Sequence, residues 1–66
     1  MRLKELRQNG KLTQRQVAEA IHCSPVVYSR YERGEREPDI ETLCRLADYF
    51  RVTVDALIGH TLPQQP

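Results

Sequence analysis

Hydrophobic residues along most of this chain recur at a helical spacing. In five successive segments, residues 1–8, 14–21, 25–33, 40–50 and 54–58, apolar side chains stand three or four positions apart. This period places them on one face of an α-helix, whereas a half-buried strand would repeat every second residue. The pattern therefore predicts an all-α fold of five helices, with no strand and no internal repeat.

Residues 13–34 contain the most clearly marked pair of helices. Thr13 suits the N-cap of the first helix, and Gln16 stands three residues later, where a capping box requires Glu or Gln. A tight turn at His22 and Cys23 separates this helix from the next. Two short helices joined in this way are typical of a helix-turn-helix motif.

The second helix of this motif has clear ends and two distinct faces. Ser24 is a second N-cap, Pro25 takes the first helical position, and Gly34 can adopt the left-handed conformation that ends a helix. Tyr28 and Tyr31 share the face that we expect to be buried. The opposite face is short and partly apolar, which suits insertion into a groove. It consists of Pro25, Val26, Ser29, Arg30 and Arg33.

Two further helices are expected to complete a single domain over residues 1–59. Asp39 and Thr53 are suited to cap them, and Gly59 is suited to end the last one. Residues 60–66, with two prolines and two glutamines, are expected to form a flexible C-terminal tail. The longer of the two helices has a wide apolar stripe formed by Ile40, Leu43, Cys44, Leu46, Ala47 and Phe50.

The charge is unevenly distributed although the net charge is only +1. Residues 1–36 hold eight Lys and Arg against four Asp and Glu, a balance of +4, and residues 37–66 hold two against five, a balance of −3. A basic front and an acidic back are expected of a domain that docks on DNA. An ordinary solvated surface of mixed charge explains the same distribution equally well.

The remaining chemistry argues against an enzyme or a metalloprotein. Cys23 and Cys44 are not spaced as a CxxC pair, and we expect buried, reduced thiols rather than a disulfide. His22 beside Cys23 falls short of a tetrahedral metal site, and no catalytic arrangement of side chains occurs, so we expect no metal and no cofactor. Without a signal peptide or a long apolar run, the expected location is the cytoplasm, away from membranes.

Three stretches of the sequence carry a resemblance to a known family. These are LTQRQVAEAI, CSPVVYSRYERG and REPDIETLCRLADYFRVTVDALIG. Together they resemble the lambda-repressor-like, XRE-type helix-turn-helix family over residues 3–59, nearly the whole chain. Two departures are visible. His22 stands at a turn position often held by glycine, and Glu35 and Glu37 make the loop after the motif unusually acidic.

The resemblance implies roles for particular residues. An ion pair between Arg7 and Glu32 would tie the first helix to the motif, and the base-reading set would be Pro25, Val26, Ser29 and Arg30. For Val26, packing in the core is an alternative. Candidate phosphate contacts, each of which is otherwise a solvated polar side chain, are Gln14, Lys11, Arg15, Ser24, Arg33 and Arg36.

The expected function is sequence-specific binding of double-stranded DNA by a transcriptional regulator, a repressor acting on a pseudo-palindromic operator. One recognition helix reads few bases, so a homodimer is expected, with its interface at Val54, Leu57 and Ile58. No small-molecule ligand is expected. The alternatives are an antitoxin or a restriction–modification controller of the same fold. A protein-interaction module that has lost DNA binding is a further alternative, favoured by the acidic loop.

Overall fold

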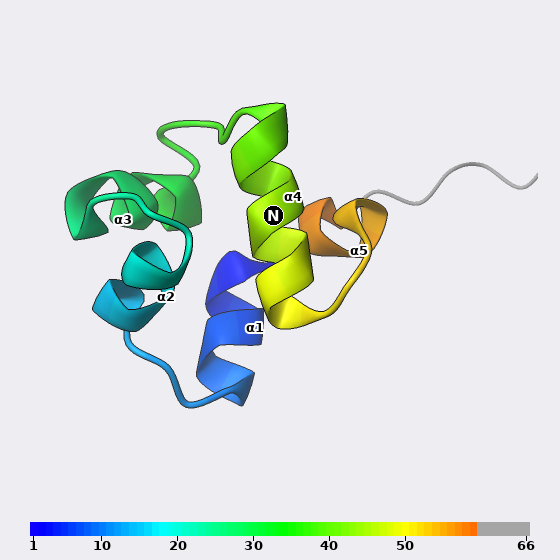
Figure 1. Cartoon of the computed structure of the whole chain (residues 1–66), viewed down its shortest axis with the longest axis horizontal. Helices are drawn as coiled ribbons and strands as arrows, with labels where there is room; N and C mark the ends of the chain where they lie inside the picture. The colour runs from blue at the N-terminus through cyan, green and yellow to red at the C-terminus, as the bar shows by residue number, and fades with distance from the viewer. Residues whose placement is uncertain (60–66) are drawn as a thin grey trace, which may run out of the picture.

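The computed structural model describes residues 1–59, and within them it contains five α-helices and no strand. The predicted all-α architecture of five helices is confirmed (Figure 1). The predicted tail, residues 60–66, lies outside the described residues. The helices are α1 (Leu3–Asn9), α2 (Gln14–Ala20), α3 (Pro25–Arg33), α4 (Ile40–Phe50) and α5 (Val54–Ile58).

Four of the five helices begin at the residues that the sequence marks as caps. The hydroxyls of Thr13, Ser24 and Thr53 and a carboxylate oxygen of Asp39 each accept a hydrogen bond from the backbone amide three residues later. At α2 the capping box is complete, because the Thr13 amide also donates to Oε1 of Gln16 at 2.8 Å. These contacts satisfy amides that a helix leaves without partners in its first turn.

Two left-handed residues shape the motif, Gly34 at its end and His22 in its turn. Gly34 ends α3 with φ of 75°, a conformation that glycine adopts without steric cost. His22, in the turn between α2 and α3, takes φ of 60°. The turn therefore needs a left-handed residue, and a histidine occupies the position that glycine would fill more easily.

A small core lies between the helices, and the motif contributes most of it. Tyr28 and Tyr31 pack inward from α3, as predicted. All five helices contribute to the core or to its immediate border. The fully or nearly fully buried hydrophobic residues are Leu3, Val17, Ala18, Ile21, Tyr28, Tyr31, Leu46, Ala47 and Leu57.

The predicted apolar stripe of α4 is only partly buried. Leu46 and Ala47 belong to the core, but Ile40 is 80% exposed and Cys44 is also exposed. For Ile40 the reason is visible in Figure 1, where the N-terminal end of α4 extends past α1 and α5. The expectation of two buried thiols is thus wrong for Cys44, whereas Cys23 is half-buried; both cysteines are free of disulfides.

Candidate nucleic-acid interface

The two faces of α3 differ sharply in exposure. The side of Tyr28 and Tyr31 packs against the core, and α2 and α1 both contact α3. On the opposite side, Pro25 and Arg30 are exposed, and Val26 is 62% exposed. A core position for Val26 is therefore wrong, since its side chain points away from the packed helices.

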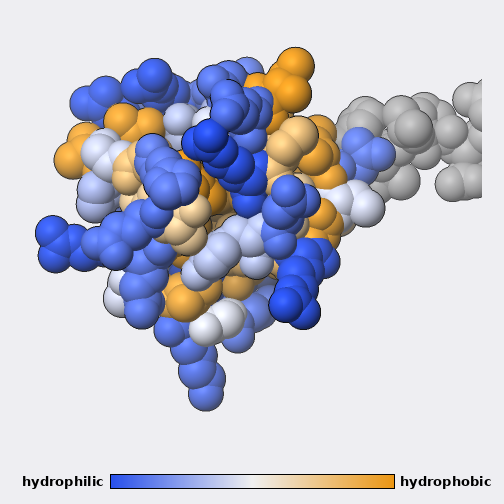
Figure 2. Space-filling view, in the orientation of Figure 1, coloured by the Kyte–Doolittle hydropathy of each residue, from blue (hydrophilic) through white to orange (hydrophobic). Residues whose placement is uncertain are grey.

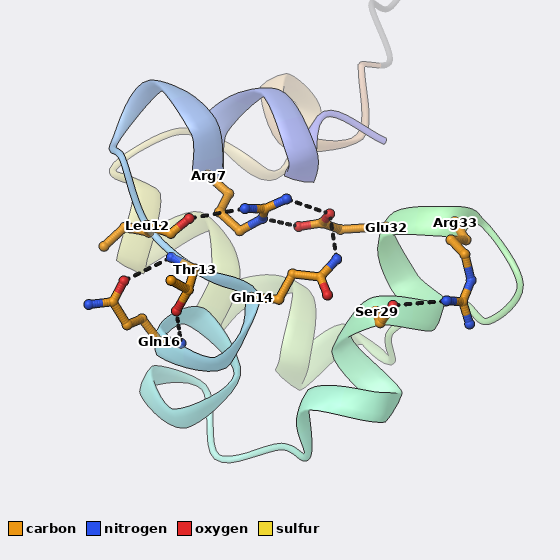
Figure 3. A network of polar contacts seen from close by, with 8 residues as sticks. All are labelled: Arg7, Leu12, Thr13, Gln14, Gln16, Ser29, Glu32 and Arg33. Atoms are coloured by element: carbon orange, nitrogen blue, oxygen red, sulfur yellow. Dashed lines mark hydrogen bonds and ion pairs between the residues drawn. The ribbon is translucent and has the colours of Figure 1, made fainter.

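The base-reading candidates lie on one surface, although not all are equally free. Ser29 is half-buried, and its hydroxyl oxygen accepts a hydrogen bond from Nη1 of Arg33 at 3.0 Å (Figure 3). Arg30 makes no side-chain hydrogen bond or ion pair to another described residue. Residues of both motif helices line a shallow hollow on this surface. They are Gln14, Pro25, Val26, Ser29 and Arg33.

The candidate phosphate contacts fall into two groups. Lys11, Arg15 and Arg36 are exposed, as is Ser24, whose hydroxyl accepts from the amide of Val27 and keeps its own hydrogen for another partner. Gln14 and Arg33, by contrast, already donate hydrogen bonds to carboxylates of the same chain. Gln14 donates to Glu32, which is buried in an ion pair, and Arg33 donates to the exposed Glu35.

The buried Arg7–Glu32 ion pair, here called the inner pair, is present as the resemblance implies. Arg7 donates from Nε to Oε2 of Glu32 at 2.6 Å and from Nη2 to Oε1 at 3.2 Å. Its Nη1 donates to the backbone oxygen of Leu12 at 3.0 Å. Only 14% of the Arg7 side chain and 4% of the Glu32 side chain are exposed. The pair therefore joins α1 to α3 and to the start of the motif (Figure 3).

Gln14 is the third donor to this carboxylate. Its Nε2 donates to Oε1 of Glu32 at 3.0 Å, so the amide nitrogen points inward rather than toward a ligand (Figure 3). Burial by itself raises the pKa of the Glu32 carboxyl, but the hydrogen bond from Arg7 and the other donors around it outweigh burial, and the pKa lies below its ordinary value. Glu32 thus remains ionised at neutral pH, which keeps its three hydrogen bonds intact.

The exposed Arg33–Glu35 ion pair, here called the outer pair, was not predicted from the sequence. Arg33 donates from Nε to Oε2 of Glu35 at 2.8 Å and from Nη2 to Oε1 at 3.3 Å. About half of each side chain is exposed, 54% and 56%. The hydrogen bond from Arg33, aided by its charge, holds the pKa of the Glu35 carboxyl below its ordinary value. The left-handed turn at Gly34 was the available signal, because it reverses the chain between these two residues.

The predicted dimer interface needs a correction. Leu57 is fully buried in the core and has no surface to offer a second copy. Val54 and Ile58 are half-buried and keep part of their side chains at the surface. Ile58 borders a shallow hollow that it lines with Met1, Glu37, Pro38 and Leu43. Figure 2 shows hydrophobic side chains gathered on this side, over the N-terminal end of α4 and beside α5.

Two negative observations apply to the described part of the chain. Residues 1–59 contain no group of three or more His, Cys, Asp or Glu side chains placed to hold a metal ion. Among the same residues, every helix is too short and too polar to cross a bilayer.

Comparisons with known proteins agree with this geometry. A family model described as helix-turn-helix matches residues 3–57. The chain is 41% identical over 58 residues to ImmR, an HTH-type transcriptional regulator of Bacillus subtilis, covering 88% of this chain and 46% of ImmR. It is 38% identical over 58 residues to RstR, a cryptic phage CTXphi transcriptional repressor of Vibrio cholerae, covering 88% of this chain and 52% of RstR.

A solved structure has the same fold. The crystal structure of a transcriptional regulator from Listeria innocua matches with a TM-score of 0.87 at 35% identity, over 96% of this chain and 59% of that one. The chain spans about half the length of the curated relatives described above. Because the family model covers most of the chain and the motif geometry is present, the chain belongs to the lambda-repressor-like, XRE-type helix-turn-helix family of DNA-binding transcriptional regulators.

Proposed function

We propose that this protein binds double-stranded DNA sequence-specifically, with α3 in the major groove, and represses transcription from a pseudo-palindromic operator. The observation that carries the proposal is the outward face of α3, where an exposed valine stands one turn before an exposed arginine on a rigidly anchored helix. A buried tyrosine pair holds the other side of the same helix. Such a face suits a groove that offers both methyl groups and hydrogen-bond acceptors.

Arg30 and Val26 are the proposed centre of base recognition. A guanidinium can donate to O6 and N7 of one guanine together, and a valine can contact the methyl group of thymine. Pro25 and Ser29 flank them on the same surface. Ser29 keeps its hydroxyl hydrogen free to donate, because its oxygen is the acceptor in the contact with Arg33.

The surrounding polar groups would hold the helix on the duplex. Lys11, Arg15, Ser24 and Arg36 are exposed and suited to phosphate oxygens. Gln14 is proposed to contribute through the backbone amide at the start of α2, because its side-chain nitrogen already donates to Glu32. These contacts would add affinity without discriminating between sequences.

A second copy of this chain is the proposed partner. Figure 1 places α3 and α5 at opposite ends of the molecule, so contact between copies near α5 leaves both recognition helices free. The apolar surface at Ile58, continued by Met1, Leu43 and Val54, replaces the buried Leu57 in this proposal. A two-fold pair would present its recognition helices to half-sites about 34 Å apart, one turn of duplex.

The dimer proposal is tested with Ile58→Glu. A carboxylate in the apolar contact should weaken association in sedimentation and weaken operator binding with it, while helix content by circular dichroism stays unchanged. Sedimentation that shows an unaltered dimer would place the interface elsewhere on the molecule.

The proposal for base recognition is tested with two arginines of equal charge. Sequences bound by the wild-type protein are first selected from a random duplex pool. Arg30→Ala should then lose about 1–3 kcal/mol on the selected site and relax the preference at one base pair per half-site. Arg36→Ala, in the loop after α3, should weaken all duplexes equally and reduce the salt slope by about one. Uniform loss for Arg30→Ala would make it a phosphate contact instead.

One alternative has an observation in its favour. A protein-interaction module without DNA binding would fit the neutralisation of Arg33 by Glu35 on the outward side of α3. Selection from the random duplex pool distinguishes this alternative from the proposed DNA-binding function, because such a module would enrich no duplex at all.

For a DNA-binding repressor, we place the protein in the cytoplasm, where its operator would be.

A further inference from the structure

The outer ion pair, Arg33–Glu35, lies at the edge of the proposed DNA interface. Arg33 lines the hollow on the DNA-facing side together with Gln14, Pro25, Val26 and Ser29. Its charge is the last one on the recognition helix, and it is a candidate phosphate contact. In the structure, however, a carboxylate of the same chain occupies the position that a phosphate would take relative to this guanidinium.

The geometry of the contact is that of anion recognition. A guanidinium offers five N–H donors in a fixed plane. Two of those on Arg33 are directed at the two oxygens of Glu35, and a third at the hydroxyl of Ser29. The side of the guanidinium formed by Nε and Nη2 is thus committed to a carboxylate in the two-bond arrangement that a phosphate would also use. One anion must leave before the other can bind in the same way.

Because the outer pair is exposed, exchanging one anion for the other costs the fold little stability. Both side chains are more than half exposed, and exposed ion pairs contribute little to stability. The pair can therefore open without unfolding any element. Its effect falls instead on DNA binding, because a charge that is already neutralised releases fewer counterions from DNA when it arrives there.

Resting on the proposed DNA-binding function, we infer that Glu35 is an internal competitor for Arg33, which holds this arginine off the DNA backbone and lowers sequence-independent affinity. Glu35 itself touches no base. It limits the affinity of the protein for any duplex. A larger share of the total affinity must then come from the specific contacts of Arg30 and Val26. Electrostatic affinity is shared by all sequences, so limiting it leaves the choice of site to the base contacts.

The test uses Glu35→Gln and a matched control, Glu19→Gln. Glu19 is an exposed carboxylate on α2 that forms no ion pair within residues 1–59, so its change also removes one negative charge from the motif. Affinity for a random-sequence duplex is measured at several salt concentrations. One additional phosphate contact makes the salt slope steeper by about 0.9 and increases affinity about eightfold near 0.1 M salt. Glu35→Gln should show both changes, and Glu19→Gln a smaller gain with little change of slope.

Arg33→Gln is introduced into both the wild-type protein and the Glu35→Gln variant. The comparison separates the release of Arg33 from a general loss of negative charge. In the wild-type protein this change leaves Glu35 as one more solvated carboxylate, so it should cost no more affinity than Glu19→Gln gains. In the Glu35→Gln background it should cancel the eightfold gain and restore the shallower slope. All of these residues are exposed, and thermal unfolding followed by circular dichroism checks that each variant is folded.

The outcomes distinguish a failure of the Glu35 inference from a failure of the proposed DNA binding. If the wild-type protein binds duplex DNA but Glu35→Gln behaves like Glu19→Gln, the inference is overturned and the proposed function stands. The same follows if Arg33→Gln costs as much in the wild-type background as in the Glu35→Gln background. If no variant and no wild-type protein binds any duplex at low salt, the proposed function fails and the inference fails with it.

Discussion

Two neighbouring residues at the end of α3, Glu32 and Arg33, form ion pairs of the same chemistry, one buried and one exposed. Each pair joins a guanidinium to a carboxylate through two hydrogen bonds, at 2.6 and 3.2 Å for Arg7–Glu32 and at 2.8 and 3.3 Å for Arg33–Glu35. The exposed fractions of the side chains are 14% and 4% in the inner pair and 54% and 56% in the outer pair. Bond geometry alone therefore does not say what either pair does.

Burial assigns the two pairs different roles. Removing one partner of a buried pair leaves a charge without solvent or counter-ion, and the fold loses stability. An exposed partner left alone is simply solvated, so the outer pair can open at little cost. The inner pair also gains a third donor from Gln14 and a backbone acceptor at Leu12, which join α1, α2 and α3. The inner pair is suited to hold the motif together, and the outer pair to exchange one anion for another.

The largest expected effect is the loss of the inner pair. Glu32→Ala should lower the free energy of unfolding by about 3 kcal/mol, because the Arg7 guanidinium then stays largely buried without its counter-ion. Arg7→Ala should cost a similar amount, and the double variant less than the sum, since the residues share one interaction. Urea denaturation measures all three. Losses below about 0.5 kcal/mol for both single variants would mean that the inner pair behaves like an exposed one.

A smaller effect is expected from the third donor. Gln14→Ala removes one hydrogen bond to the Glu32 carboxylate but leaves both bonds from Arg7, so a loss of about 1 kcal/mol is expected. The same denaturation series measures it, and Gln16→Ala is a useful comparison because Gln16 serves only the local capping box. If Gln14→Ala had no effect in the Glu32→Ala background, the loss would belong to the Glu32 contact.

The two carboxylates should also differ in acid. The pKa of Glu32 is lowered in the folded protein, so its ionised form contributes stability above the unfolded value, near 4.3, and this contribution disappears as pH falls through the folded value. The thermal stabilities of the wild-type protein and Glu32→Gln should therefore approach each other as the pH falls below the unfolded pKa and coincide only below the folded pKa. The pKa of Glu35 is lowered too, so its contribution has the same sign, but solvent screens this exposed pair and the difference between Glu35→Gln and the wild type should be much smaller. A difference for Glu35→Gln as large as that for Glu32→Gln would remove the distinction.

The smallest expected effect on the fold is that of the outer pair. Arg33→Gln and Glu35→Gln, alone or together, should leave the urea midpoint within experimental scatter, because the pair is exposed and joins only α3 to the adjacent turn. A clear loss of stability in either variant would show that the outer pair is structural, and the contrast with the inner pair would fail.

Local features of the fold were predictable from the sequence because they depend on residues three or four positions apart. The capping box of Thr13 and Gln16, the Ser24 cap with Pro25 after it, and the end of α3 at Gly34 all occur where expected. The inward position of the tyrosines followed from the helical period in the same way. Arg7 and Glu32 are 25 positions apart, and only the resemblance to a family brought them together.

Tertiary structure decided the questions that spacing could not answer. Ile40 and Leu57 both lie on apolar helix faces, yet Ile40 is 80% exposed and Leu57 is fully buried. Periodicity identifies an apolar face, but neighbouring helices determine which turns of that face are covered. The Arg33–Glu35 contact likewise needs the left-handed turn at Gly34 to point one side chain back at the other. Local sequence thus determined where the helices begin and end, whereas burial and charge pairing were decided by packing, because they depend on which surfaces meet in space.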